Sequence, residues 1–207
     1  SLVRDSKRRG QDSSGLLQCS QKGPYELLRA DFDLENLIKG VDPRHVQAIF
    51  GHSRLITNGM QHNQPVRYGD TFVFHNGIVL NSSKIWKETG LTARTNLDSE
   101  VIAAFVDKHV KQFGTMHGCW DAFRKIVEGA VSCIVLSPRT GEGAAFSNTG
   151  SMYSGTVATG TLWASEEASL VNVGADDIRQ IIDEKLFQIP VRKINVQPER
   201  KIQRVDL

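Results

Sequence analysis

The sequence predicts an α+β fold in which antiparallel sheet packs against helices that lie outside it. Segments with the composition of strands follow one another in adjacent pairs rather than alternating strictly with helices. Such pairs are typical of antiparallel sheets, whereas strict alternation is typical of doubly wound parallel folds. The 207 residues, of which 40% are hydrophobic and 23% charged, suit one globular domain.

We therefore expect a single domain over residues 1–207, in which residues 187–207 form a C-terminal tail or an edge strand. The formal net charge of +2 is too small to indicate a nucleic-acid partner by itself. The sequence contains no apolar run long enough to cross a bilayer and no signal-peptide pattern, so no membrane partner is expected either.

The N-terminal part of the chain is expected to open with a helix and to continue with short buried elements. Gly10 would end the first helix, because glycine tolerates the left-handed conformation found there. The expected elements are a helix from Ser1 to Arg9, a strand from Gly15 to Cys19, a helix from Leu34 to Lys39 capped by Asp33, and a strand from Ala48 to Phe50.

Asn76 and Gly77 predict the turn of a β-hairpin. Both residues tolerate positive φ, and strand-like runs flank them, at Thr71–His75 and Ile78–Leu80. The polar stretch before this hairpin, residues 57–70, has no clear periodicity.

The clearest helix of the sequence runs from Asp98 to Phe113. Its apolar residues recur at helical spacing and fall on one face, at Val101, Ile102, Phe105, Val106 and Val110. The other elements expected in this half are helices at Trp120–Val127 and Asp177–Leu186 and strands at Val131–Leu136, Ala144–Ser147, Met152–Ser154, Thr161–Ala164 and Val191–Val196.

The three cysteines, Cys19, Cys119 and Cys133, are odd in number and not in CxxC spacing. This pattern argues against a disulfide framework or a zinc site and favours a reducing compartment, so we expect a cytoplasmic protein. Cys133 is expected to be an inert thiol within a strand, and Cys119 to lie in a loop.

Several short motifs follow one another in an order that is more informative than any one of them. Alone, Asn76-Gly77 would be a hairpin turn, Arg54 an ion-pair partner and Asp98 a helix cap. The set is Arg-Gly-Gln-Asp-Ser-Ser-Gly at 9–15, Gly-His-Ser-Arg-Leu-Ile-Thr at 51–57, Gln64-Pro65, His-Asn-Gly-Ile at 75–78, Asp-Ser-Glu-Val at 98–101, Phe-Ser-Asn-Thr-Gly at 146–150 and Ala-Ser-Glu-Glu at 164–167.

In this order and at these spacings, the chain resembles the glutaminase domain of class II, N-terminal-nucleophile glutamine amidotransferases. The likeness runs from Arg9 to about Val171 and is greatest to the glucosamine-6-phosphate synthase branch. The resemblance implies a four-layer α/β/β/α sandwich of two antiparallel sheets. It also implies hydrolysis of the glutamine side-chain amide to glutamate and ammonia through a cysteinyl thioester, without metal or cofactor.

The resemblance gives specific roles to the motif residues. Arg54 would pair its guanidinium with the α-carboxylate of L-glutamine, and Thr57 would add a further donor to it. Asp98 would accept from the α-ammonium group. Asn76 and Gly77 would stabilise the oxyanion through a side-chain amide and a backbone N–H. Arg9 and Asp12 would support the nucleophile segment.

The sequence departs from this family at the nucleophile. The family uses an N-terminal cysteine whose own α-amine activates the thiol, on a strand upstream of the position of Arg9. Ser1 stands too close to Arg9 to replace it, and none of the three cysteines matches that position. Two explanations stay open: the cysteine strand lies upstream of Ser1, or the protein keeps only the binding scaffold.

Two hypotheses therefore follow from the sequence. One is an active glutaminase that passes ammonia to a synthase domain or subunit. The other is a catalytically inactive glutaminase-like module that binds glutamine or regulates a partner. The sequence disfavours a metalloprotein, because His52, His62 and His75 lack metal-site spacing. Homo-oligomerisation is left open.

Overall fold

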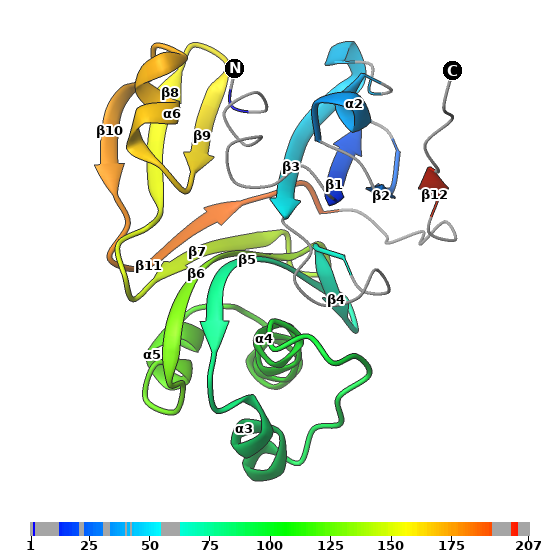
Figure 1. Ribbon diagram of the computed structural model, residues 1–207, viewed down its shortest axis with the longest axis vertical. Coiled ribbons are helices and arrows are strands. Elements are labelled where there is room, and N and C mark those ends of the chain that lie inside the picture. Colours follow the sequence, from blue (N-terminus) through cyan, green and yellow to red (C-terminus); the bar gives the residue numbers. More distant parts are fainter. Residues whose placement is uncertain are drawn as a thin grey trace.

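The computed structural model describes residues 2, 13–20, 23–30, 34–39, 41, 43–54, 63–191 and 200–202 (Figure 1). Several expectations concern residues outside these ranges. They are the first helix with Gly10, the cap Asp33, the supporting residues Arg9 and Asp12, the substrate contact Thr57, His62 and most of the strand expected at 191–196.

The described strands form three sheets. A five-stranded sheet has the order β11-β7-β6-β5-β4, a four-stranded sheet the order β12-β2-β1-β3, and a three-stranded sheet the order β10-β8-β9. Within these sheets neighbouring strands are antiparallel, except for β12 beside β2. The strands are β1 (Ser13–Ser20), β2 (Tyr25–Ala30), β3 (Val46–Arg54), β4 (Val66–Tyr68), β5 (Thr71–Val79), β6 (Gly129–Ser137), β7 (Glu142–Ser147), β8 (Tyr153–Val157), β9 (Gly160–Ala164), β10 (Asp176–Gln180), β11 (Asp183–Gln188) and β12 (Arg200–Ile202).

Helices cover the outer faces of the two larger sheets. The helices are α2 (Leu34–Ile38), the 3₁₀ turn η1 (Pro43–His45), α3 (Ser82–Thr89), α4 (Glu100–Phe113), α5 (Cys119–Phe123) and α6 (Glu167–Asn172). In Figure 1, α3, α4 and α5 lie beneath the five-stranded sheet, and α2 lies against β1–β3. None of the helices in the described ranges is long and apolar enough to cross a membrane.

Besides a small cluster of Ala145, Met152 and Ile181, three buried clusters hold the layers together. One joins α4 and α5 to β5, β6 and β7, with Val101, Trp120 and Phe146 among its members. A second fills the space between the two larger sheets and includes Leu17 and Phe72. A third packs α2 on the four-stranded sheet. The order of layers is helix, sheet, sheet, helix, so the expected four-layer α/β/β/α sandwich is confirmed.

The helix expected at Asp98–Phe113 is confirmed as α4, which begins at Glu100. It forms because the sequence carries an apolar stripe at helical spacing, which is buried on one face of the helix. Val101, Ile102, Val106 and Val110 are buried against the sheet. The expected strands at Gly15–Cys19, Ala48–Phe50 and Val131–Leu136 are also present, within the longer β1, β3 and β6. The expected helix at Trp120–Val127 is shorter and one residue displaced, as α5.

Two expectations were wrong because sheet pairing overrides local preference. Asn76 and Gly77 make no hairpin turn; β5 runs through them, paired with β6 from Phe72 to Val79. The expected helix at Asp177–Leu186 is instead the two strands β10 and β11, which pair with β8 and β7. Asp177 and Asp183 have positive φ values of 47° and 70°, which a helix does not permit.

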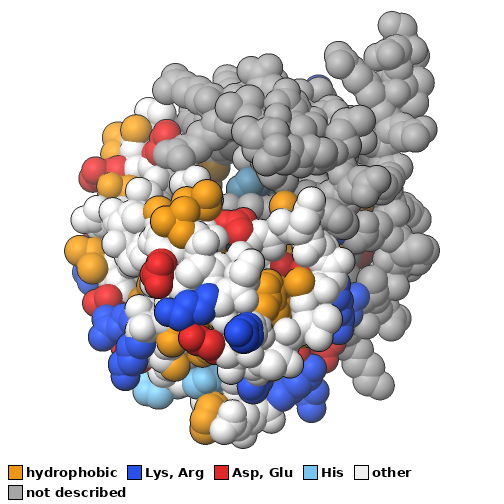
Figure 2. Space-filling model, turned by 60° about the horizontal axis from the view of Figure 1, so that its bottom comes forward, with side chains coloured by type: hydrophobic (Ala, Val, Ile, Leu, Met, Phe, Trp, Pro, Cys, Tyr) orange, Lys and Arg blue, Asp and Glu red, His pale blue; other side chains and the backbone are white. Residues whose placement is uncertain are grey.

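Cys119 also differs from expectation. It does not lie in a loop but is the first residue of α5 and is fully buried. Cys19 and Cys133 are likewise buried, in β1 and β6. Figure 2 brings forward the helical side of the molecule, where described side chains of both charges are mixed. This mixture agrees with the small net charge.

Candidate active site at the edge of β5

The candidate site lies along the edge of β5 that faces away from β6. In an antiparallel pair, successive residues turn their N–H groups alternately toward and away from the partner strand. The register pairs Val79 with Gly129, and one step further along, the Leu80 N–H donates to the Glu128 carbonyl. Even-numbered residues of β5 therefore direct their N–H groups toward β6. The N–H groups of His75, Gly77 and Val79 therefore share the outer edge.

A glutamine side chain occupies the first position on this edge. The His75 N–H donates to Gln64 Oε1 at 2.5 Å, and Gln64 Nε2 donates to the His75 carbonyl at 2.7 Å. Gln64 is itself 7% exposed. Its side chain thus replaces a neighbouring strand for one residue, which fixes the backbone directly before Asn76.

A carboxylate occupies the third position. The Val79 N–H donates to Asp98 Oδ2 at 2.6 Å, and the Ser99 N–H donates to Asp98 Oδ1 at 2.8 Å. Asp98 is half-buried. Its carboxylate therefore joins β5 to the start of α4 instead of capping that helix, and each oxygen keeps a lone pair beyond its backbone partner.

Gly77 stands between these two occupied positions. No hydrogen bond from its N–H to a described residue is present outside the β5–β6 pair, and the alternation turns that N–H away from β6. Its φ is 143°, and a Cβ there would overlap the Ala130 carbonyl oxygen and lie 2.9 Å from His75 Nε2. Glycine is required at this position for both conformation and space.

The imidazole of His75 is buried and held at both nitrogens. Nδ1 lies 2.9 Å from Ser99 Oγ, and Nε2 lies 3.3 Å from the Ala130 carbonyl oxygen. Burial lowers the pKa of His75, and the neighbouring Asp98 carboxylate offsets part of this effect. The ring is therefore neutral at pH 7.

Asn76 turns toward the interior of the sandwich. Its side chain lies on the same face of β5 as those of Phe72 and Phe74, which pack between the two larger sheets. In the β5–β6 register Asn76 is opposite Ser132. Among the residues that the structure describes, none bonds its side-chain amide. Beside it, Ser132 Oγ lies 2.8 Å from Ser147 Oγ and 2.9 Å from Thr149 Oγ1, so a row of hydroxyls continues from Asn76 across the sheet.

The second sheet meets the site at Gln64. A Cβ at Gly15 of β1 would overlap the Gln64 carbonyl, so this glycine allows the two backbones to touch. Asn63 Nδ2 donates to the Ser14 carbonyl at 2.9 Å. Arg54 is the last residue of β3 and pairs with Ser13, the first residue of β1. The backbone at Arg54 is thus near this junction, although its side chain lies outside the described part of the chain.

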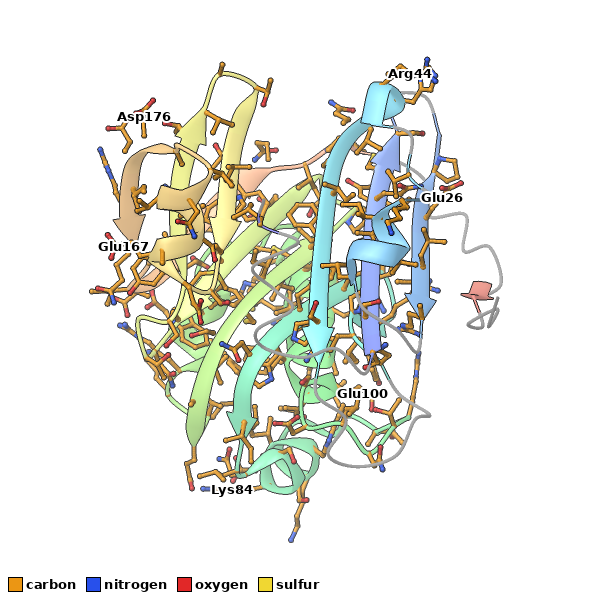
Figure 3. The ribbon with its side chains drawn as sticks, turned by 45° about the horizontal axis from the view of Figure 1, so that its top comes forward. Glu26, Arg44, Lys84, Glu100, Glu167 and Asp176 are labelled. Atoms are coloured by element: carbon orange, nitrogen blue, oxygen red, sulfur yellow. The ribbon has the colours of Figure 1, made fainter. Side chains whose placement is uncertain are left out.

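The loop before Asp98 is fixed by a second carboxylate. Glu100, labelled in Figure 3 at the start of α4, is fully buried. Its Oε2 accepts the N–H groups of Arg94 and Thr95 at 2.9 and 2.8 Å. These bonds hold residues 94 and 95 close to α4 and limit the positions open to Asp98.

The sequence predicted Asn76, Gly77 and Asp98 as site residues, and the structure brings all three to one end of β5. Sequence reasoning noted Gln64 and Ser99 within motifs but gave them no role. Their signal was adjacency alone: Gln64 precedes a proline and Ser99 follows Asp98. In the described ranges no cluster of three metal-ligating side chains is present.

None of the three cysteines has the character of a nucleophile. All three are buried and free of disulfides. Burial raises the pKa of the Cys119 thiol to about 12, with a smaller contribution from Glu184. Burial also raises the pKa of Cys133 well above its ordinary value. Such thiols stay protonated at neutral pH, and the expectation that Cys133 is inert agrees with this.

The chain is similar in sequence to a glutamine-dependent aminotransferase. No family model matches the chain. Over 180 residues it is 27% identical to glutamine–fructose-6-phosphate aminotransferase (isomerizing) of Aliivibrio fischeri, a match that covers 83% of this chain and 30% of that protein. The chain therefore spans less than a third of the length of this relative.

Two solved structures share the fold. The glutamine phosphoribosylpyrophosphate amidotransferase of B. subtilis, complexed with ADP and GMP, superimposes with a TM-score of 0.68 at 18% identity over 90% of this chain and 45% of its own. A structure described as the allosteric regulatory enzyme of purine biosynthesis gives 0.68 at 18% identity over 94% of this chain and 45% of its own. The chain thus has the fold of these two proteins, and the resemblance to glutamine amidotransferases that its motifs indicate is confirmed.

Proposed function

We propose that this chain is a glutaminase domain that hydrolyses the side-chain amide of L-glutamine and supplies ammonia to a synthase domain or subunit. The observation that supports this most is the order of groups on the β5 edge: a bound N–H at His75, an available N–H at Gly77 and a carboxylate beside Val79. An oxyanion donor and an ammonium acceptor are thus available two residues apart.

The two kinds of relative support glutamine as the substrate. Their names share glutamine but differ in the second substrate, fructose 6-phosphate in one and phosphoribosylpyrophosphate in the other. This chain matches 30% and 45% of their lengths. A segment shared by proteins with different acceptors is best explained by the part of the reaction that they have in common.

In the proposed reaction, a cysteine thiolate attacks the side-chain carbonyl carbon of glutamine. The carbonyl oxygen becomes an oxyanion, which the Gly77 N–H and the Asn76 amide stabilise, each donor contributing about 3–4 kcal/mol. Collapse breaks the C–N bond, the thiol proton leaves with the nitrogen as ammonia, and a thioester is formed. Water then cleaves the thioester to give glutamate and the free thiol.

The two ends of glutamine are held by charge. Asp98 accepts from the α-ammonium group, and Arg54 with Thr57 binds the α-carboxylate. Fixing both ends holds the carboxamide for attack and lowers the entropic part of the barrier. Arg9 and Asp12 support the nucleophile segment. The reaction needs no cofactor, and we propose that it takes place in the cytoplasm.

The nucleophile we propose is a cysteine other than Cys19, Cys119 and Cys133. The family chemistry requires a thiol whose own α-amine can accept its proton, and an internal cysteine has no free α-amine. The burial of all three thiols also supports this assignment.

Trapping with a glutamine-like electrophile tests the proposal. The full natural chain is treated with a diazoketone analogue of glutamine, and the adduct is located by mass spectrometry of its peptides. We expect one adduct on an N-terminal cysteine, prevented by excess glutamine, together with release of ammonia. An adduct on one of the three internal cysteines, or no adduct despite glutamine binding, would refute the catalytic proposal. The latter result would favour a catalytically inactive module that binds glutamine.

A further inference from the structure

The arrangement of protons around His75 follows from its two neighbours. The Ala130 carbonyl can only accept a hydrogen bond, so the nitrogen 3.3 Å from it, Nε2, carries the hydrogen of the neutral ring. Nδ1 is then a lone-pair acceptor. The Ser99 hydroxyl, 2.9 Å away, is the group that donates to it.

The position of the hydrogen on the His75 ring determines whether the Ser99 hydroxyl can donate to Asp98. A hydroxyl has one hydrogen, and Ser99 Oγ lies between His75 Nδ1 at 2.9 Å and Asp98 Oδ1 at 3.3 Å. While the ring is neutral, the hydrogen is directed to Nδ1. The Asp98 carboxylate then accepts from two backbone N–H groups and retains lone pairs for an external cation.

Protonation of the His75 ring would reverse the direction of the hydrogen bond between His75 and Ser99. With both nitrogens protonated, Nδ1–H donates to Ser99 Oγ, and the Ser99 hydrogen turns to Asp98 Oδ1. The imidazolium also places a positive charge close to the carboxylate, which weakens its attraction for another cation. Both changes oppose the binding of an ammonium group at Asp98.

Among the residues that the structure describes, no other charged group near His75 would produce this effect. Asp98 is the titratable neighbour whose charge affects the ring. β6 contributes the Ala130 carbonyl, and the segment before β4 contributes the uncharged Gln64. The nearby Glu100 carboxylate is bound to the backbone of residues 94 and 95.

We propose that His75 is a positioning residue for ammonium recognition: by accepting the Ser99 hydroxyl hydrogen, it keeps the Asp98 carboxylate available to the α-ammonium group of the substrate. The inference rests on the proposed function, since the cation is that of glutamine. It also predicts a difference between ligands: the affinity for a ligand without the α-amino group should not depend on whether His75 is protonated.

The proton arrangement is measurable without any variant. In the full chain labelled with ¹⁵N at histidine, two-dimensional NMR should show Nε2 protonated and Nδ1 unprotonated for His75 at neutral pH. A hydrogen on Nδ1 under these conditions would overturn the inference directly.

The functional consequence is measured by calorimetric titration of two ligands from about pH 7.5 down to pH 5, a range that extends below the ordinary pKa of histidine because burial lowers the pKa of His75. The ligands are L-glutamine and 4-carbamoylbutanoate, which is glutamine without its α-amino group. We expect the affinity for glutamine to fall about tenfold as His75 protonates, the effect of one hydrogen bond to a charged group. The affinity for the analogue should stay level.

Three variants make the result specific. Ser99→Ala should reduce the pH-dependent loss, because the hydroxyl relay is removed, and Ser99→Thr should restore it. His109→Gln removes a half-buried histidine of α4 and should behave as the natural chain. Equal weakening of both ligands, or an unchanged pH dependence in Ser99→Ala, would overturn the inference. Failure of the proposed function is a different result: glutamine would not bind even at about pH 7.5.

Discussion

The carboxylate of Asp98 accepts the backbone N–H of Val79 at 2.6 Å, which joins the segment before α4 to the edge of β5. This bond places the carboxylate two residues from Gly77 along one strand edge. Strand geometry rather than a turn therefore sets the distance between the proposed ammonium acceptor and the proposed oxyanion donor.

Replacing Asp98 by asparagine should weaken glutamine binding about tenfold to a hundredfold, because a hydrogen bond to a charged group contributes about 1.5–3 kcal/mol. Calorimetry of glutamine binding measures this. Asp107→Asn is the matched control, since Asp107 is another carboxylate of the α4 region but bonds the Asp70 N–H and Lys111. Equal losses of affinity in the two variants would contradict the role of Asp98.

Gly77→Ala should destabilise the protein more than Gly90→Ala does. Both glycines have positive φ, which costs alanine about 1–2 kcal/mol. At Gly77 the new Cβ would also overlap the Ala130 carbonyl, whereas at Gly90 no atom lies within 4 Å. The overlap should add about 1–3 kcal/mol to the loss in free energy of unfolding. Urea denaturation of both variants measures the difference; equal values would show that the strand relaxes freely.

The stability of the protein should fall as the pH drops below the ordinary pKa of histidine. Burial lowers the pKa of His75 in the folded state, so the unfolded state binds the proton more readily. The free energy contributed by the neutral ring is complete above about pH 6.5 and is lost progressively as the pH falls toward the folded-state pKa. Urea denaturation at several pH values tests this.

His75→Gln should flatten that profile, whereas the control His109→Gln, at a half-buried position of α4, should leave it unchanged. A profile that is equally steep in His75→Gln would show that the pH dependence comes from other groups.

The cysteines should react slowly in the native protein. With a pKa of about 12, roughly one Cys119 thiol in ten thousand is ionised at pH 8, and burial hinders access as well. Ellman's reagent should therefore label Cys19, Cys119 and Cys133 much faster in denaturant than in native buffer. Rapid native labelling of any of the three, located by peptide mass spectrometry, would contradict the assignment of these thiols to the core.

The sequence by itself determined the features that rest on local periodicity and on motif order. The apolar stripe from Val101 to Val110 predicts α4 because that helix buries one face. The succession of strands in adjacent pairs predicts antiparallel sheets. The order of the motifs from Arg9 to Glu167 predicts the resemblance to glutamine amidotransferases, because this combination of residue types at these spacings can be read without the fold.

Only the tertiary structure decided which groups meet. Asn76-Gly77 is locally suited to a turn, but pairing with β6 over eight positions outweighs that preference and extends β5 through both residues. Asp177 and Asp183 leave helical conformation for the same reason, because β8 and β7 offer edges to pair with. Gln64 and Ser99 act on His75 across 11 and 24 residues. Such contacts depend on long-range packing, and no local pattern in the sequence predicts them.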